Sequence, residues 1–178
     1  MNVFISGGCK NGKSYYAQKL ARRQADESGA PLYYIATMIP HDDEDRARIR
    51  RHIAERDGWG FATLECGRNL LSLLDNPKVD PSGVFLLDSV TALLSNEMFD
   101  EKGTYDPDAA KRVRDQLLTF AAKTGSTVFV SDYIYSDACQ YDTTVEAYRR
   151  GLASADRALA STCDRVIEIS GGMEEIWK

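Results

Sequence analysis

The sequence runs Val3-Phe4-Ile5-Ser6-Gly7-Gly8-Cys9-Lys10-Asn11-Gly12-Lys13-Ser14 near its beginning. The second part of this run fits the pattern G-x-x-x-x-G-K-[S/T], in which a strand leads into a loop whose backbone N–H groups surround phosphate oxygens. Lys13 supplies positive charge at the β- and γ-phosphates, Ser14 can ligate Mg²⁺, and the helix that starts there adds its positive N-terminal end. A chance match in a glycine-rich turn would lack the strand before the loop and the helical segment after it. The run therefore predicts a nucleotide-phosphate site, with Lys13 as an exposed cation.

Strand-like and helix-like segments alternate along the rest of the chain. The expected strands are residues 2–6, 32–36, 61–65, 84–87, 127–131 and 165–169, and the expected helices are 13–28, 42–56, 69–74, 106–123 and 143–161. Asp106 and Pro107 are the expected N-cap and first residue of the fourth helix. The alternation predicts an α/β fold, with a mostly parallel sheet, helices on both faces and ligands at the carboxyl ends of the strands. We find no linker or repeat, so residues 1–178 are expected to form a single nucleotide-binding domain.

Composition narrows the classes of partner. The 178 residues carry a formal net charge of −5 with no basic block, which argues against nucleic acid. The four cysteines form no C-x-x-C pair, so reduced thiols are favoured over a disulfide framework or a zinc site. Cys9 lies in the phosphate loop, either as a filler or as a reactive thiol. The apolar runs are too short to span a bilayer and Met1 leads straight into the first strand, so we expect a cytoplasmic protein without membrane insertion.

A second motif ends the apolar run Val84-Phe85-Leu86-Leu87 with the carboxylate of Asp88. In phosphate-loop nucleotidases, such an aspartate closes a strand beside the first one and holds Mg²⁺ directly or through water. The alternative is that Asp88 is only the N-cap of a following helix. Because the phosphate loop precedes it in the chain, we favour the metal role.

The third feature is His52, one of two histidines, on the charged segment 42–56. Arg48 and Arg56 lie four residues on either side of it, so the three side chains share one helical face. Such a row suits a triphosphate, and a neutral imidazole there could attack an α-phosphate. The alternative is a basic, solvated helix face that forms salt bridges with its neighbours.

Together these motifs resemble the bifunctional adenosylcobinamide kinase / adenosylcobinamide-phosphate guanylyltransferase family of cobalamin biosynthesis. The matching segments beyond the phosphate loop are Tyr34-Ile35-Ala36-Thr37, Arg48-Ile49-x-x-His52 with Arg56, Thr63-Leu64-Glu65, Leu86-Leu87-Asp88-Ser89-Val90-Thr91 and Ser95-Asn96. The resemblance covers nearly the whole chain and is strongest over residues 1–100. Phosphate loops occur in many enzymes, whereas their combination with R-I-x-x-H and T-x-E is much more specific.

The resemblance implies a RecA-like P-loop fold, a homotrimer and a corrinoid substrate. The implied reactions are phosphorylation of adenosylcobinamide and transfer of GMP from GTP to its phosphate, with GTP or ATP as donor and Mg²⁺ as cofactor. His52 would carry the GMP, Lys13 and Asp88 would complete the catalytic set, and Ser14 and Asp88 would hold the metal. The implied nucleotide contacts are Gly7, Gly8, Cys9, Lys10, Asn11, Gly12, Lys13, Ser14, Ile35, Ala36, Thr37, Ile53, Ala54, Glu55, Arg56, Glu65 and Asp88.

The second half of the chain departs from the family pattern. Ser131-Asp132-Tyr133 stands where the family usually has Asn-Glu, Ala153 and Asp156 replace an expected glycine and asparagine, and residues 170–178 are atypical. These departures put the corrinoid contacts and one of the two activities in doubt. Three alternatives remain: a small-molecule kinase that does not need His52, a nucleotide-binding switch without an acceptor pocket, and a degenerate paralogue that only binds its ligand.

Overall fold

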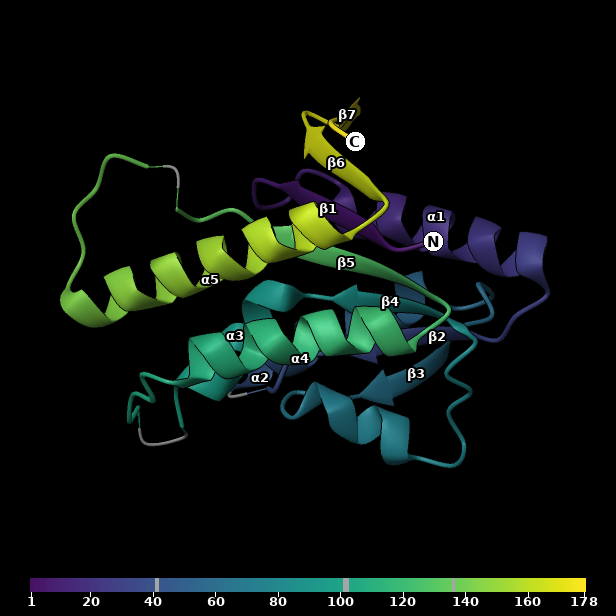
Figure 1. The fold of residues 1–178 in the computed structure, drawn as a ribbon, viewed down its shortest axis with the longest axis horizontal. Helices are drawn as coiled ribbons and strands as arrows, with labels where there is room; N and C mark the ends of the chain where they lie inside the picture. Colours follow the sequence, from purple (N-terminus) through teal and green to yellow (C-terminus); the bar gives the residue numbers. More distant parts are fainter. Residues whose placement is uncertain (41, 101–102, 136) are drawn as a thin grey trace.

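The computed structural model describes residues 1–40, 42–100, 103–135 and 137–178, without the side chains of residues 48 and 55; the second histidine, His41, lies outside this range. The described strands form a single sheet in the order β3-β2-β4-β5-β1-β6-β7 (Figure 1). The strands are β1 (Val3–Gly7), β2 (Leu32–Ala36), β3 (Ala62–Glu65), β4 (Val84–Asp88), β5 (Ser126–Asp132), β6 (Arg165–Ser170) and β7 (Met173–Ile176). The helices are α1 (Lys13–Ser28), α2 (Asp43–Glu55), α3 (Val90–Met98), α4 (Ala109–Lys123) and α5 (Thr143–Thr162), with a 3₁₀ helix, η1, at Leu70–Asp75.

Strand β1 lies between β5 and β6 and pairs with both in parallel. Its last residue, Gly7, is level with Asp132 on β5 and with Ile169 on β6. Only β7 is antiparallel among the described strands, and it closes the edge beside β6. The phosphate loop therefore leaves the sheet between two neighbouring strands, at the edge where parallel strands end and where α/β folds bind ligands.

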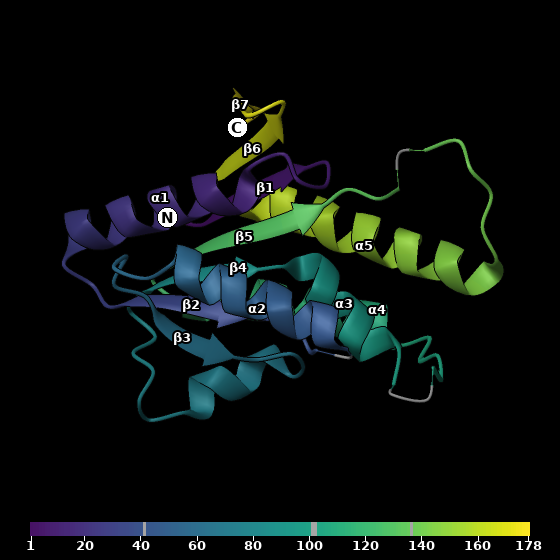
Figure 2. The same ribbon diagram turned by 180° about the vertical axis from the view of Figure 1, so that it is seen from behind.

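Helices cover both faces of the sheet, as the alternating pattern predicts (Figures 1 and 2). Val3 and Ile5 of β1 pack in one core with Ala17, Leu20 and Ala21 of α1. Figure 2 shows α2 on this same face. The opposite face packs in a larger core with α3, α4, α5 and η1. Burial of both faces explains why β1 and β4 read as apolar runs without alternation.

Four local predictions differ from the structure. Helix α3 was not expected; it has only nine residues and begins at Val90. Helix α4 begins at Ala109 with Asp108 as its N-cap, so Asp106 and Pro107 precede the helix instead of opening it. The expected helix at 69–74 is the 3₁₀ helix η1, and β7 was not predicted at all. Among the described helices, none is long and apolar enough to cross a membrane.

Candidate nucleotide site

The phosphate loop, residues 7–14, connects β1 to α1 and depends on its glycines. A Cβ at Gly7 would collide with the carbonyl oxygen of Ile169 on β6, and Gly12 has a φ of 85°, which favours glycine. Asn11 also ties the loop to β6, because its Nδ2 donates to the same Ile169 oxygen at 3.4 Å. Cys9 and Lys10 are exposed. The loop is thus held against β6 with its outer residues open to solvent.

Lys13 is buried, which corrects the expectation of an exposed cation. Its side chain is only 5% exposed. The ammonium donates to the carbonyl oxygen of Gly8 at 2.6 Å and forms an ion pair with Oδ1 of Asp132, also at 2.6 Å. The physical reason is that β5 lies beside β1 and ends in a carboxylate level with Gly7. Asp132 is therefore the ion-pair partner of Lys13.

Asp88 ends β4 and is half-buried at the carboxyl edge of the sheet. The hydroxyl of Tyr34 donates to its Oδ2 at 3.0 Å. The N-cap of the following helix is Ser89, whose Oγ accepts from the N–H of Ala92 at 3.2 Å. The N-cap role therefore belongs to Ser89, and within the described residues no hydrogen bond reaches Oδ1 of Asp88.

Mg²⁺ prefers oxygen ligands and is commonly held by one or two carboxylates together with substrate phosphates. A hydroxyl from Ser14 and a carboxylate from Asp88 match this donor set. Within the described residues there is no cluster of three or more histidine, cysteine, aspartate or glutamate side chains that could hold a metal alone. The residues present thus fit an ion that binds with a nucleotide.

The segment after β2 supports the edge of the sheet. Thr37 is fully buried; its Oγ1 donates to the carbonyl oxygen of Ser89 at 2.9 Å and accepts from the N–H of Ser89 at 2.7 Å. Asn96 donates to the carbonyl oxygens of Thr37 and Gly67. Ile35 is also fully buried, Ala36 is half-buried at the strand end and Glu65 is exposed. Thr37 therefore joins β2 to the start of α3.

His52 lies in the last turn of α2 and is half-buried. Arg56, one turn later, is 8% exposed, and its guanidinium carbon lies 3.6 Å from the centroid of the Tyr34 ring. A cation over an aromatic face at this distance is attracted by the ring. Ile53 and Ala54 are exposed, and the side chains of Arg48 and Glu55 lie outside the described part. The end of the His52 helix is thus connected to Asp88 through Arg56 and Tyr34.

A second contact, which was not predicted from the sequence, joins the segment after α2 to helix α1. Tyr15, directly after Ser14, packs edge-to-face on Trp59, three residues after Arg56, with ring centroids 5.9 Å apart. The neighbouring Arg22 donates to the carbonyl oxygen of Trp59 at 2.6 Å. The segment after α2 therefore lies against the first turns of α1. In the sequence, this contact is indicated only by an aromatic residue near each motif: Tyr15 after the phosphate loop and Trp59 after Arg56.

Two of the departures from the family pattern contact each other. Oγ of Ser131 donates to Oδ2 of Asp156 at 3.1 Å, and the hydroxyl of Tyr135 donates to the same oxygen at 2.9 Å. Asp156 is 3% exposed, and burial raises the pKa of its carboxyl to about 6. Its Oδ1 is buried without a hydrogen-bond partner among the described residues. Ser131 and Asp156, far apart in the sequence, thus belong to one buried polar cluster, and Ser131 directly precedes Asp132 in β5.

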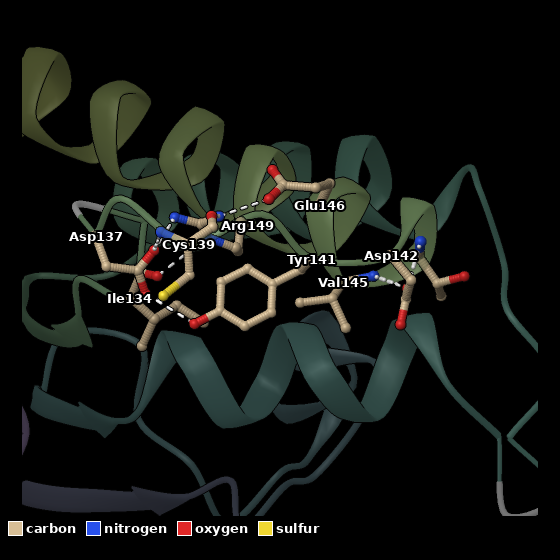
Figure 3. A network of polar contacts seen from close by, with 9 residues as sticks. Ile134, Asp137, Cys139, Tyr141, Asp142, Val145, Glu146 and Arg149 are labelled. Atoms are coloured by element: carbon tan, nitrogen blue, oxygen red, sulfur yellow. Dashed lines mark hydrogen bonds and ion pairs between the residues drawn. The ribbon is translucent and has the colours of Figure 1, made fainter.

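The loop that follows Asp132 is fastened to α5 by Arg149 (Figure 3). The guanidinium is buried, pairs with Asp137 at 2.8 Å and with Glu146 at 2.6 Å, and donates from Nε to the carbonyl oxygen of Ile134 at 3.2 Å. It also lies over the ring of Tyr141, 4.8 Å from the centroid. Arg149 therefore ties Ile134, Asp137 and Tyr141 to α5.

Comparison with known proteins places the chain in a family. The family model described as "Cobinamide kinase / cobinamide phosphate guanyltransferase" matches residues 3–175. The bifunctional adenosylcobalamin biosynthesis protein CobU of Salmonella typhimurium is 28% identical over 184 residues, covering 97% of each chain. The protein of the same name from Escherichia coli is 37% identical over 109 residues, which are 61% of this chain and 56% of that protein.

Among solved structures, the ATPase domain of G40P superposes with a TM-score of 0.52 at 11% identity, covering 94% of this chain and 68% of the other. At this identity the likeness shows the fold alone, and it confirms the expected P-loop architecture. The match of the family model over nearly the whole length confirms the resemblance drawn from the motifs. The chain therefore belongs to the cobinamide kinase / cobinamide phosphate guanyltransferase family, whose members are enzymes of cobalamin biosynthesis.

Proposed function

We propose that the protein phosphorylates adenosylcobinamide and then transfers GMP from GTP to adenosylcobinamide phosphate through a guanylylated His52. The observation that carries this proposal is the connection from Arg56, through the ring and hydroxyl of Tyr34, to Asp88. Because Arg56 follows His52 by one turn, this connection fixes the end of α2 relative to the expected metal ligand. The contact between Tyr15 and Trp59 supports the same placement from the phosphate loop.

For the kinase reaction, the chain positions the triphosphate and supplies positive charge to its phosphate groups. The backbone N–H groups of the phosphate loop and the N-terminus of α1 favour phosphate oxygens. Lys13 is already at the base of the loop, where its ammonium would neutralise charge on the β- and γ-phosphates. Mg²⁺, when bound with the nucleotide by Ser14 and Asp88, would neutralise further phosphate charge. Phosphoryl transfer depends chiefly on such positioning and charge stabilisation.

The guanylyl transfer needs a nucleophile at the α-phosphate. A neutral ring nitrogen of His52 would form a bond to this phosphorus as the bond to pyrophosphate breaks. A phosphate oxygen of the corrinoid would then attack the same phosphorus, and the nitrogen–phosphorus bond would break. Arg56 is buried against Tyr34, so its role is to hold the helix end and add positive charge beside the site. Two displacements thus replace a single direct attack of the corrinoid phosphate on GTP.

Two labelled nucleotides separate the reactions. With the γ-phosphate labelled, purified protein, adenosylcobinamide and Mg²⁺ should give a labelled corrinoid phosphate. With the α-phosphate of GTP labelled and corrinoid phosphate supplied, the label should enter a GDP-linked corrinoid. Product in the first reaction alone would favour a simple kinase, and no product in either would favour a protein that only binds nucleotide.

A homotrimer and a cytoplasmic location complete the proposal, both supported by family membership. Sedimentation at micromolar concentration tests the assembly: a trimer is the expected species, and a stable monomer would contradict it.

A further inference from the structure

Asp132 ends β5, which lies between β1 and β4 in the sheet. The phosphate loop follows β1, and the expected metal ligand Asp88 ends β4. Asp132 is level with Gly7 on β1, and its N–H donates to Oγ1 of Thr91 on α3 at 2.9 Å. The N–H of the next residue, Tyr133, donates to the carbonyl oxygen of Gly7 at 3.3 Å. On the other side of β5, Val130 is level with Asp88 on β4. Hydrogen bonds to α3 and to β1 therefore fix the backbone around Asp132 at the carboxyl end of β5.

The ion pair with Lys13 conflicts with the proposed use of that lysine. The ammonium is 2.6 Å from Oδ1 of Asp132 and almost fully buried, whereas the carboxylate is 31% exposed. A triphosphate in the loop would compete with Asp132 for the same ammonium. It would also bring negative charge close to the carboxylate.

Other acidic side chains near this edge have partners other than Lys13. Asp88 accepts from Tyr34, Asp156 is buried in the cluster with Ser131, and Asp137 pairs with Arg149. Burial raises the pKa of Tyr148, and the negative charge of Asp132 raises it further, while the pKa of Tyr133 is raised by its hydrogen bond to Glu168. Asp132 thus combines contact with the phosphate-loop lysine and exposure to solvent.

We propose that Asp132 is a catalytic residue of the phosphoryl transfer: it holds Lys13 while the loop is empty, and it takes the proton of the acceptor hydroxyl once the phosphates have drawn Lys13 away. This inference rests on the proposed kinase activity. In the step, the O–H bond of the acceptor breaks and its proton passes to Asp132. The acceptor oxygen forms a bond to the γ-phosphorus, whose bond to the β-phosphate oxygen breaks, and the nucleoside diphosphate leaves.

The proposal predicts opposite signs for two effects of Asp132→Asn. The affinity for a non-hydrolysable triphosphate analogue should rise about fivefold, because the competing carboxylate is gone. The rate of corrinoid phosphorylation at saturating nucleotide should fall about 100-fold or more, which is the usual scale for loss of a general base. A purely structural role would lower both quantities together. Asp132→Glu, which keeps the carboxylate, should retain most of the rate.

A control removes a solvent-exposed ion pair elsewhere. Asp115→Asn breaks the pair with Lys111 on the exposed face of α4, 2.8 Å long, and should change neither affinity nor rate. Calorimetry measures affinity, labelled phosphate measures rate, and guanylylation of the Asp132→Asn protein by GTP shows that it is folded. Equal rates in wild type and Asp132→Asn, unchanged or weaker binding in Asp132→Asn, or an Asp132→Glu protein that is folded but inactive would overturn the proposal. An inactive wild type would instead remove the proposed function on which it rests.

Discussion

The guanidinium of Arg56 lies 3.6 Å from the centroid of the Tyr34 ring, and through this ring the helix of His52 is connected to the strand of Asp88. Tyr34 is 4% exposed, so the contact is made inside the protein, where a charge–ring attraction is stronger than at the surface. One tyrosine therefore has two functions: its face holds the end of α2, and its hydroxyl orients a carboxylate.

Tyr34→Phe separates these two functions. The ring remains for Arg56, whereas the bond to Oδ2 of Asp88 is lost, which should lower the free energy of unfolding by about 1–2 kcal/mol. The Mg²⁺ concentration needed for half-maximal kinase rate should rise, because the carboxylate is less well oriented. Tyr33→Phe is the matched control: the Tyr33 hydroxyl accepts from the N–H of Asp80, so this variant should lose stability without a change in the Mg²⁺ titration.

Lys13→Met tests the buried cation. Methionine keeps most of the apolar stem, so the fold should be retained, while the charge at the phosphates disappears. Triphosphate affinity should fall at least about tenfold, as expected for loss of a hydrogen bond to a charged group. Calorimetry with GTP and ATP measures this effect. Undiminished affinity in Lys13→Met would show that the loop does not bind triphosphates through this side chain.

Asp156→Asn tests the buried cluster through pH. The folded protein binds the proton of Asp156 more tightly than the unfolded chain does, because burial raises the pKa from 3.8 to about 6. The carboxyl therefore destabilises wild type progressively as pH rises from about 4 to about 6, and the full cost remains above that range. Asparagine does not ionise and can still accept from Ser131. The variant should thus gain stability relative to wild type between pH 4 and pH 7, by roughly 2–3 kcal/mol.

Urea unfolding at pH 4, 5, 6 and 7 measures this gain. Asp115→Asn is a control that should lose stability instead of gaining it. The reason is that hydrogen bonds from Lys111 and Arg114 lower the pKa of Asp115, so its ionised carboxylate stabilises the fold. A gain for Asp156→Asn that is the same at all four pH values would mean that Asp156 does not titrate in this range.

The sequence predicted those parts of the site that depend on local patterns. The phosphate loop, the buried strand before Asp88 and the helix of His52 each combine a periodic pattern with a motif, and the structure places them as expected in the fold. Helix α3 was missed because nine mostly apolar residues carry little helical periodicity. Strand β7 was missed because all four of its residues are exposed, so its sequence has no buried face to detect.

The long-range partners could not be predicted. Lys13 was expected to be exposed because nothing in the loop indicates that Asp132, on a strand more than 100 residues later, lies beside it. The same holds for Ser131 and Asp156, which read as separate departures until the fold brings them together. Strand order, which decides these contacts, is a property of the whole sheet.

The site of GMP attachment tests the central claim most directly. The protein is incubated with α-labelled GTP and Mg²⁺ without corrinoid, digested at neutral to alkaline pH, and analysed by mass spectrometry alongside the His52→Asn variant. We predict an acid-labile, hydroxylamine-resistant GMP adduct on the peptide that contains His52, and no adduct in the variant, which should still phosphorylate adenosylcobinamide. An adduct on another residue, or one that persists in His52→Asn, would contradict the account.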